Sequence, residues 1–415
     1  MSEADLQATD ILLPSAGVAV FSHDAETLRN AADIRNDWRF ARVTLDVAPG
    51  DVETAIQVFS ERDAPALVIL QTDTIDEAFL GRLEALSAYC SQDTAAVVIG
   101  PVNDVYLYRN LIEMGVSDYL VRPVQKDVLS EVIAKTLVNR LGVSGSRLIA
   151  FLGAKGGVGT TALIQAMALG VSELWGQKVV LIDASGGWSS LSVGMGFDPA
   201  GTLREISRMV EKKDENGLKR LFVEQGERLS IMAGGGDAML DPTILPDQYE
   251  KFLDFLMVKA PVVLADLSGA ESFLKKLLIA RANQTVLVAT PTLTALRFAR
   301  SLIKEISDLR GGDKTDVSLI LNKTGMAKAY EVTAQEAQKA LEAPVAASVP
   351  YLPALFLGHE SNARQILSDK EGLDILKNSL LPVLGKTITP PSDGFLDEKS
   401  DKKTGLLGSF LTKKK

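Results

Sequence analysis

Short apolar runs alternate with longer amphipathic segments along most of the chain. In the first third, five such runs are separated by helical patterns, which predicts a small doubly wound α/β domain. The runs are continuously apolar and do not alternate with polar residues, so we expect parallel strands that are buried on both faces. They lie at residues 18–21, 42–47, 66–70, 95–100 and 118–121.

A second and larger set of apolar runs follows a segment rich in glycine and serine, residues 142–147, which we expect to be a linker. Seven strand candidates, mostly separated by helical segments, predict a larger parallel α/β sheet. They lie at residues 147–153, 178–184, 229–234, 261–267, 285–290, 317–323 and 346–348. We therefore expect an N-terminal tail over residues 1–16, one domain over 17–141 and a second over 148–384.

The C-terminal end changes character. Residues 385–404 are rich in Pro, Asp and Lys and poor in apolar residues, which predicts a disordered linker. Residues 405–415 regain apolar side chains on one helical face, with lysines on either side, which favours a basic amphipathic tail that contacts a membrane surface. A solubilising tail and a peptide that docks into a partner remain open alternatives. The apolar side chains are Leu406, Leu407, Phe410 and Leu411.

Composition narrows the classes of function. A chain of 415 residues can form two cores with tails, and a net charge of -9 argues against a protein that coats nucleic acid, so we expect no specific nucleic-acid partner. One cysteine, Cys90, cannot form an internal disulfide, and neither it nor the two histidines have metal-ligand spacing. No signal peptide and no run of about 18 uncharged apolar residues is present. These features favour a cytoplasmic protein.

A glycine-rich segment, residues 151–161, joins a predicted strand to a predicted helix. Gly156, Gly157 and Gly159 allow a tight turn that directs backbone N–H groups at phosphate oxygens, and the helix N-terminus adds partial positive charge. Thr161 offers a hydroxyl to Mg²⁺. The ordinary phosphate loop has a lysine where this chain has Thr160. The alternative is a glycine turn that only packs a helix on a strand.

The run Lys-Gly-Gly-Val-Gly at residues 155–159 resembles the signature of the deviant Walker A ATPases, the family that includes MinD and ParA. The resemblance implies ATP and Mg²⁺ as cofactors and an ATP-dependent sandwich homodimer, in which Lys155 reaches the partner's nucleotide as a catalytic residue. The phosphate contacts that it implies are those of Gly156, Gly157, Val158, Gly159, Thr160 and Thr161.

Two aspartates at strand ends resemble the family's metal-binding acids. Asp183 stands where the family has its first switch aspartate, and Asp266 resembles the Walker B aspartate, followed by Gly269 at the turn that senses the γ-phosphate. With Thr161 they would hold Mg²⁺, although Asp266 could instead cap a helix. The family commonly has a second acid two residues after the first to position the attacking water. Here that residue is Ser185, so we expect weak ATP hydrolysis at most.

The base end of the nucleotide site also has counterparts. Asn322, with Lys323 after it, resembles the family's adenine-contacting asparagine, whose amide can pair with the edge of the base. Pro350 lies in a run that resembles the loop that closes over the base. Leu352 stands in that loop where an acid is common.

The first domain resembles response-regulator receivers in its strand spacing and in residues 118–123, which parallel the receiver's last strand and its Lys-Pro pair. Receiver phosphorylation requires an acid pair after strand one, an aspartate after strand three, Ser or Thr after strand four, and that lysine. We therefore predict a pseudo-receiver used for docking or self-association. A shifted but active site at Asp73, with Asp24 near it, is the alternative. The residues at the four places are Ser22 and His23, Gln71, Gly100, and Arg122.

The order of a receiver-like domain followed by a deviant P-loop domain resembles the TadZ/CpaE proteins, which localise the assembly machinery of tight-adherence type IV pili at a bacterial cell pole. The resemblance implies two doubly wound parallel-sheet domains, the first flavodoxin-like and the second a P-loop NTPase domain. It also implies a cytoplasmic localisation factor, which the tail could hold against the inner membrane. Its partners would be the pilus secretion machinery and a second copy, bound through the nucleotide face or the receiver-like domain.

A cycling ATPase of the ParA/MinD type, which positions cargo on membrane or DNA, is the alternative function. It requires efficient hydrolysis and, for DNA, a basic surface. Several basic pairs could form local patches, although such pairs are more often solvated helix faces. They are Lys212 and Lys213, Lys219 and Arg220, and Lys275 and Lys276.

Overall fold

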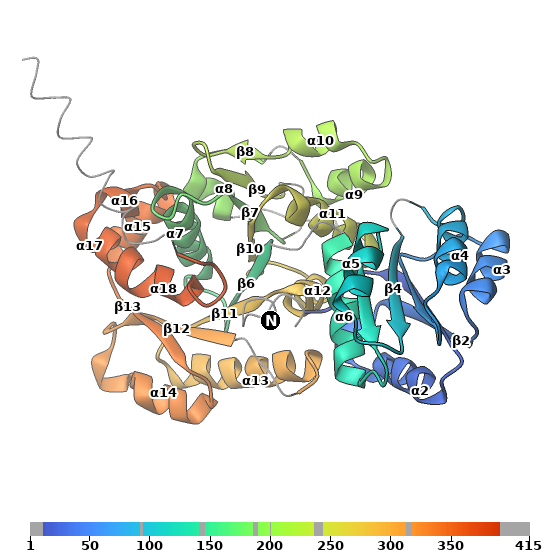
Figure 1. The fold of residues 1–415 in the computed structure, drawn as a ribbon. Coiled ribbons are helices and arrows are strands. Elements are labelled where there is room, and N and C mark those ends of the chain that lie inside the picture. Colours follow the sequence, from blue (N-terminus) through green and yellow to red (C-terminus); the bar gives the residue numbers. More distant parts are fainter. Residues whose placement is uncertain are drawn as a thin grey trace, which may run out of the picture. The chain divides into compact units, whose positions relative to one another are not determined.

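The structure is a computed structural model with two compact units. The first comprises Met1–Gly145 with Leu309–Asp313, and the second comprises Ser146–Asp308 with Lys314–Lys415. Each unit contains one β-sheet (Figure 1). The structure describes residues 11–91, 94–140, 146–185, 190–199, 201–235, 244–312 and 317–390. The predicted amphipathic tail, with Leu406, Leu407, Phe410 and Leu411, lies outside the described residues.

The first unit is a five-stranded parallel sheet in the order β2-β1-β3-β4-β5. Its central strand β3 is buried along its whole length, as the continuous apolar pattern predicts. The strands are β1 (Ala16–Ser22), β2 (Val43–Pro49), β3 (Leu67–Gln71), β4 (Ala95–Gly100) and β5 (Asp118–Val121). This flavodoxin-like order confirms the fold predicted for this unit.

Helices cover both faces of this sheet. Helices α2 (Ala25–Asp33) and α6 (Lys126–Arg140) pack together, with the 3₁₀ turns Ile34–Asn36 and Trp38–Phe40 after α2. The opposite face carries α3 (Val52–Glu61), α4 (Glu77–Ser87) and α5 (Val105–Glu113), which share one apolar core with β1, β3 and β4.

The second unit is an eight-stranded sheet in the order β13-β12-β11-β6-β10-β7-β9-β8. Strand β8 pairs antiparallel with β9 at the edge, and the other pairs are parallel. The sheet was expected to be parallel, and the edge strand β8 is an exception. This strand has only two residues, which are too few to give a pattern of apolar residues in the sequence. The strands are β6 (Arg147–Gly153), β7 (Val179–Asp183), β8 (Val223–Glu224), β9 (Leu229–Met232), β10 (Val262–Asp266), β11 (Gln284–Ala289), β12 (Val317–Thr324) and β13 (Val345–Pro350).

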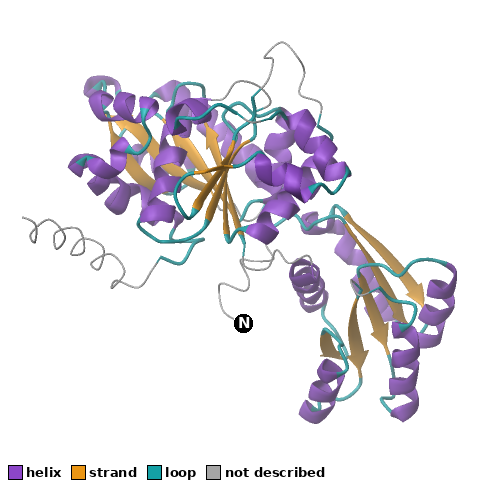
Figure 2. Cartoon of the chain, turned by 90° about the horizontal axis from the view of Figure 1, so that it is seen from above, coloured by secondary structure: helices purple, strands orange, loops and turns teal. Residues whose placement is uncertain are grey.

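Helices also cover both faces of the larger sheet (Figure 2). On one face lie α7 (Thr160–Glu173), α15 (Pro353–Ser361), α16 (Gln365–Ser368), α17 (Lys370–Ile375), a π-helical turn (Leu376–Leu380) and α18 (Leu381–Leu384). On the other lie α11 (Pro246–Lys259), α12 (Ser272–Arg281), α13 (Leu293–Leu309) and α14 (Ala334–Leu341), with a 3₁₀ turn at Lys328–Tyr330. Helices α8 (Ser190–Met195), α9 (Leu203–Glu211) and α10 (Glu215–Arg220) lie between β7 and β8 in the chain.

Helix α7 is buried almost all round, because the sheet covers one side and the C-terminal helices cover the other. A Cβ on Gly170 would lie 2.8 Å from Leu381 Cδ2, so the closeness of this packing requires a glycine. The ordered chain also continues past the boundary expected at Leu384. Ile388 is in the core, and the Thr387 hydroxyl donates to Gln284 Oε1 at 2.9 Å. The C-terminal part of α7 is thus held by packing against residues far along the sequence.

A buried ion-pair network joins α11 to α12. The side chain of Arg281 on α12 is fully buried, and its Nη1 and Nη2 donate to Glu250 at 3.0 Å and Asp254 at 2.7 Å. Removal of one member of such a network leaves charge buried without a partner, which is costly.

We predict that Arg281→Ala lowers the free energy of unfolding of the second unit by about 3–5 kcal/mol, because Glu250 loses its buried counter-charge. Arg364→Ala is the matched control, since Arg364 is 46% exposed and pairs with Glu173 at the surface. Its loss costs about 0–1 kcal/mol. Urea denaturation of both variants measures the difference, and equal small losses would contradict the assignment.

Candidate functional site

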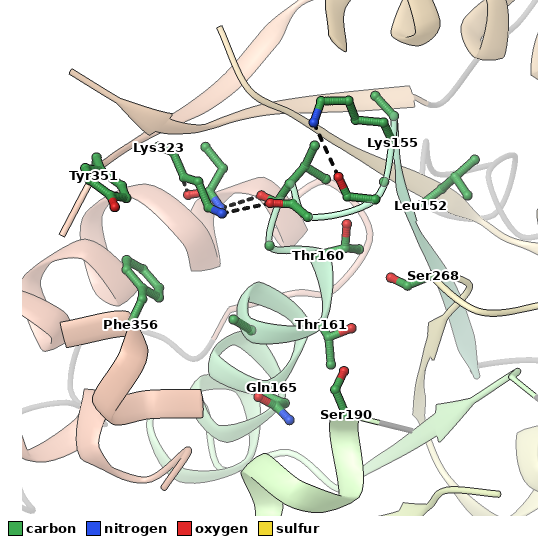
Figure 3. Close-up of a pocket in the computed structure, with 18 of the residues that line it drawn as sticks. Leu152, Lys155, Thr160, Thr161, Gln165, Ser190, Ser268, Lys323, Tyr351 and Phe356 are labelled. Carbon is green, nitrogen blue, oxygen red and sulfur yellow. Dashed lines mark hydrogen bonds between the residues drawn. The ribbon is translucent and has the colours of Figure 1, made fainter. Parts of the chain in front are cut away.

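A cavity of about 730 Å³ lies where β6 ends and α7 begins. The loop between them, residues 152–162, forms most of one wall. The opposite walls come from the end of β12, the loop after β13 and helix α15. Figure 3 shows Thr160 and Thr161 between an aromatic side, with Tyr351 and Phe356, and a hydroxyl-rich side, with Ser190 and Ser268. Parallel α/β sheets bind ligands at this edge.

The loop conformation depends on glycine. Gly157 and Gly159 have φ angles of +77° and +91°, in the left-handed region that side chains disfavour. Gly159 is also the N-cap of α7, so the next residues, Thr160 and Thr161, form the first helical turn. The first N–H groups of a helix lack intrahelical acceptors, and the helix dipole adds positive potential there. The wall at this point is therefore suited to an anion.

Asn322 and Lys323 near the end of β12 hold the loop through hydrogen bonds. Asn322 Nδ2 donates to the Val158 carbonyl at 2.8 Å, and Lys323 Nζ donates to the Gly157 carbonyl at 2.7 Å (dashed in Figure 3). Asn322 Oδ1 accepts from the Lys323 backbone N–H at 2.9 Å. Both polar atoms of the Asn322 amide are thus bonded within the protein. Contact of Asn322 with a base stays a prediction.

The charged side chains that line the cavity within the described part of the chain are all positive. Three lysines line it, and none of its lining residues in the described part of the chain is acidic. Lys155 is exposed, and its Nζ donates only weakly, at 3.4 Å, to the carbonyl of its neighbour Gly156. The lysines are Lys155, Lys275 and Lys323. Together with the helix N-terminus, they favour a polyanionic ligand.

Asp183 and Asp266 end the neighbouring strands β7 and β10 and lie directly opposite each other in register. Both are almost fully buried, 5% and 1% exposed, and each accepts the N–H of the serine two residues on, at 2.7 Å and 2.9 Å. Neither lines the cavity. The alternative that Asp266 caps a helix is wrong, because Glu271 is the N-cap of α12.

The three groups that the resemblance assigns to Mg²⁺ all offer oxygen atoms, the ligands that Mg²⁺ prefers. They are the carboxylates of Asp183 and Asp266 and the hydroxyl of Thr161. Among the described residues, His, Cys, Asp and Glu side chains nowhere form a group of three or more that could hold a metal ion by themselves. Burial and the charge of Asp183 raise the pKa of Tyr249 on α11. The phenol near these acids is therefore neutral.

Ser185 and Gly269 face each other behind the acids. A Cβ on Gly269 would lie 2.7 Å from the Cβ of Ser185, so a side chain at residue 269 would displace the Ser185 loop. Ser185 is 7% exposed, and its hydroxyl has no hydrogen-bond partner among the described residues. At residue 185, where the sequence has no second acid, the structure therefore has the small neutral side chain of serine.

The end of the cavity formed by the loop after β13 and by α15 is apolar. Pro350 ends β13 and lines the cavity, and the Tyr351 N–H donates to the Thr324 carbonyl at 2.8 Å. Contact of Pro350 with a base stays a prediction. Several lining residues were not assigned to the site from the sequence, because they belong to no recognised motif. They are Gln165, Ser190, Ser268, Lys275, Leu302, Phe356 and Leu357. Tyr351 also lines the cavity, and its place beside Pro350 in the run over residues 349–353 was a local signal for it.

In the first unit, the receiver's phosphorylation place is filled by neutral side chains. The buried Ser22 hydroxyl donates to Gln71 Oε1 at 2.9 Å. Asp24 caps α2, and hydrogen bonds from the Thr27 hydroxyl and N–H lower the pKa of its carboxyl group. Asp73 is 74% exposed and pairs with Arg122. Asp24 and Asp73 thus serve a helix cap and a surface ion pair.

Comparison with known proteins gives matches among solved structures. No family model matches this chain, and no curated protein does. A CpaE pilus assembly protein of Sinorhizobium meliloti is 32% identical, with 29% of this chain and 98% of that chain covered and a TM-score of 0.28. CpaE of Caulobacter crescentus is 29% identical, with 29% and 93% covered and a TM-score of 0.29. MinD of Pyrococcus horikoshii, solved with Mg-ADP, is 18% identical, with 64% and 99% covered and a TM-score of 0.47.

The second unit has the fold of a P-loop NTPase domain, with a glycine-rich loop between β6 and α7, and it is in the same chain as a receiver-like domain. At 32% identity over nearly the whole Sinorhizobium protein, the chain belongs to the CpaE family of pilus assembly proteins. No helix in the described part of the chain is long and apolar enough to span a membrane.

We predict that Gly159→Ala lowers the free energy of unfolding by about 1–3 kcal/mol, because alanine is strained at this φ and its Cβ would lie 2.5 Å from Asn322 Nδ2. Gly156→Ala is the matched control in the same loop, since a Cβ there meets no atom within 4 Å. Its cost should stay within about 0.5 kcal/mol. Thermal unfolding of both variants tests this, and equal costs would show that the loop is not held as described.

Proposed function

We propose that the P-loop domain, residues 148–384, binds Mg-ATP, and that ATP occupancy favours a homodimer that localises pilus assembly. One observation carries the proposal: the cavity joins a helix N-terminus and three lysines to an apolar end. Its volume, about 730 Å³, lies within the range of roughly 300–1,000 Å³ common for small-molecule sites. The cationic end suits a triphosphate, and Tyr351, Phe356 and Leu357 suit a base.

Lys155 supports dimerisation through this face. Its long side chain is exposed at the mouth of the cavity and is bound only weakly to its own loop, so it is free to reach a phosphate on a second copy. A lysine ammonium that leaves water for a bound polyphosphate gains a charge-assisted hydrogen bond. The nucleotide then links the two copies.

Binding, and not turnover, is the switch in this proposal. A ligand shifts a conformational or oligomeric equilibrium through its differential affinity for the two states, and hydrolysis is not required. Ser185 offers no carboxylate to orient an attacking water, which supports weak or absent ATP hydrolysis.

The receiver-like domain, residues 17–141, supplies a docking surface for a polar landmark, the pilus secretion machinery or another copy. Helix α5 supports this role, because it exposes apolar and aromatic side chains of a kind that is enriched at interfaces. Tyr106 is 84% exposed and Val105 is 62% exposed. Polar localisation of a tight-adherence pilus in a bacterium follows from this recruitment.

The mass of the chain in solution tests this function. With Mg-ATP the wild type should form a dimer, and with Mg-ADP or no nucleotide it should stay a monomer. Lys155→Ala should weaken the dimer at least roughly tenfold, because it removes a charge-assisted contact. Light scattering after size exclusion measures the mass, and phosphate release is followed in the same samples.

A mass that does not respond to ATP would contradict the nucleotide-gated dimer. Rapid phosphate release by the wild type would instead favour a cycling ATPase. Lys276→Ala is the matched control, since Lys276 is on α12 beside Lys275 and does not line the cavity. It should dimerise as the wild type does.

We predict that Ser185→Asp raises the rate of phosphate release roughly tenfold or more, because a carboxylate there can orient water at the γ-phosphate. Ser185→Ala is the control and should leave the rate unchanged, since the Ser185 hydroxyl has no partner among the described residues. Release measured with a coupled phosphate assay decides. A slow Ser185→Asp variant that still binds ATP would show that another feature limits hydrolysis.

A further inference from the structure

Helix α15 forms part of the apolar wall of the cavity. Phe356 and Leu357 line the cavity from this helix, and Figure 3 shows Phe356 facing the loop at the base end. His359 lies one turn further along α15, with its ring edge-on to Phe356 at 6.4 Å between ring centroids. It is fully buried, at 0% exposed.

The histidine joins α15 to the start of α7. His359 Nε2 lies 2.9 Å from the Ala162 carbonyl oxygen. A carbonyl only accepts, so Nε2 carries the hydrogen. Ala162 follows Thr161 in the first turn of α7 and itself lines the cavity. This hydrogen bond therefore connects the wall at the base end to the helix at the phosphate end.

Packing alone does not account for a histidine here. His359 Nδ1 makes no regular hydrogen bond among the described residues, and the backbone N–H beside it, that of Ala363, donates to Gly194, so burial of this nitrogen costs free energy. Burial lowers the pKa of His359, in keeping with a neutral ring. A leucine could fill the space without that cost, but it could not donate to Ala162.

A second attachment fixes the far end of the same segment. The Ala363 N–H, just after α15, donates to the Gly194 carbonyl of α8 at 2.9 Å. Gln165 of α7 donates to the Leu191 carbonyl of α8 at 3.0 Å. Helix α8 contributes Ser190 to the cavity. Helix α15 is thus attached to α7 through His359 and to α8 through Ala363.

We propose that His359 is a positioning residue for the nucleotide site: its bond to Ala162 holds α15 so that Phe356 and Leu357 contact the base. The inference rests on the proposed function and assigns the base-dependent part of the affinity to this bond. Phosphate contacts come from the loop and do not pass through α15. The two parts of the affinity are therefore separable.

Titration with Mg-ATP and with Mg-tripolyphosphate, which has no base or ribose, tests the inference on the full chain. His359→Leu should weaken Mg-ATP binding roughly 5–10-fold, the value of one hydrogen bond and the packing that it orders. Tripolyphosphate affinity should change less than roughly twofold. His359→Gln should restore most of the loss, because its amide nitrogen can donate to the same carbonyl.

Leu355→Ala is the matched control, since Leu355 is buried on the same helix and does not line the cavity. It should lower the melting temperature and leave the ratio of the two affinities unchanged. If His359→Leu does not fold, His359→Asn replaces it, because its shorter amide does not reach Ala162.

The inference is overturned if His359→Leu, or His359→Asn in its place, keeps the wild-type ratio of the two affinities, as it would if both ligands weakened equally. That result, with a wild type that binds both ligands, leaves the proposed function intact. A wild type that binds neither ligand overturns the proposed function and this inference with it.

Discussion

The left-handed turn at Gly159 is the constraint on which the site depends. It ends the loop, starts α7 and brings the Val158 carbonyl to Asn322, which holds it from β12. Because α7 is buried almost all round, its first turn cannot move to relieve a change in the loop. The loop therefore already has its conformation in the absence of a ligand. Less free energy is then lost in ordering the site when a ligand binds.

Both units have a sheet covered by helices on both faces, but the charges of the side chains at the ends of their strands differ. In the second unit, the strand ends carry buried acids, and the cavity carries cations. In the first unit, the corresponding edge has a neutral Ser22–Gln71 hydrogen bond, and Asp24 and Asp73 are bound elsewhere. The buried acids and the cationic cavity are thus features of the second unit, and the corresponding place in the first unit is neutral.

Local patterns predicted much of this, and long-range packing explains what they missed. The continuous apolar runs located the strands of both sheets, except for β8, which has only two residues. The loop was identifiable because its three glycines, Gly156, Gly157 and Gly159, lie close together in the chain. The apolar wall was not, because Leu302 and Phe356 meet the loop only after the sheet forms. Nor could the sequence reveal that the Asn322 amide holds the loop, since a bond to a carbonyl 164 residues away leaves no local pattern.

Calorimetric titration of the full chain with Mg-ATP tests the central claim most directly, since every later step depends on an occupied cavity. The account predicts saturable binding of one nucleotide per chain, which Gly159→Ala weakens and Lys276→Ala, outside the cavity, preserves. Absence of saturable binding, or binding that Gly159→Ala leaves unchanged, would contradict the claim that this loop is the nucleotide site.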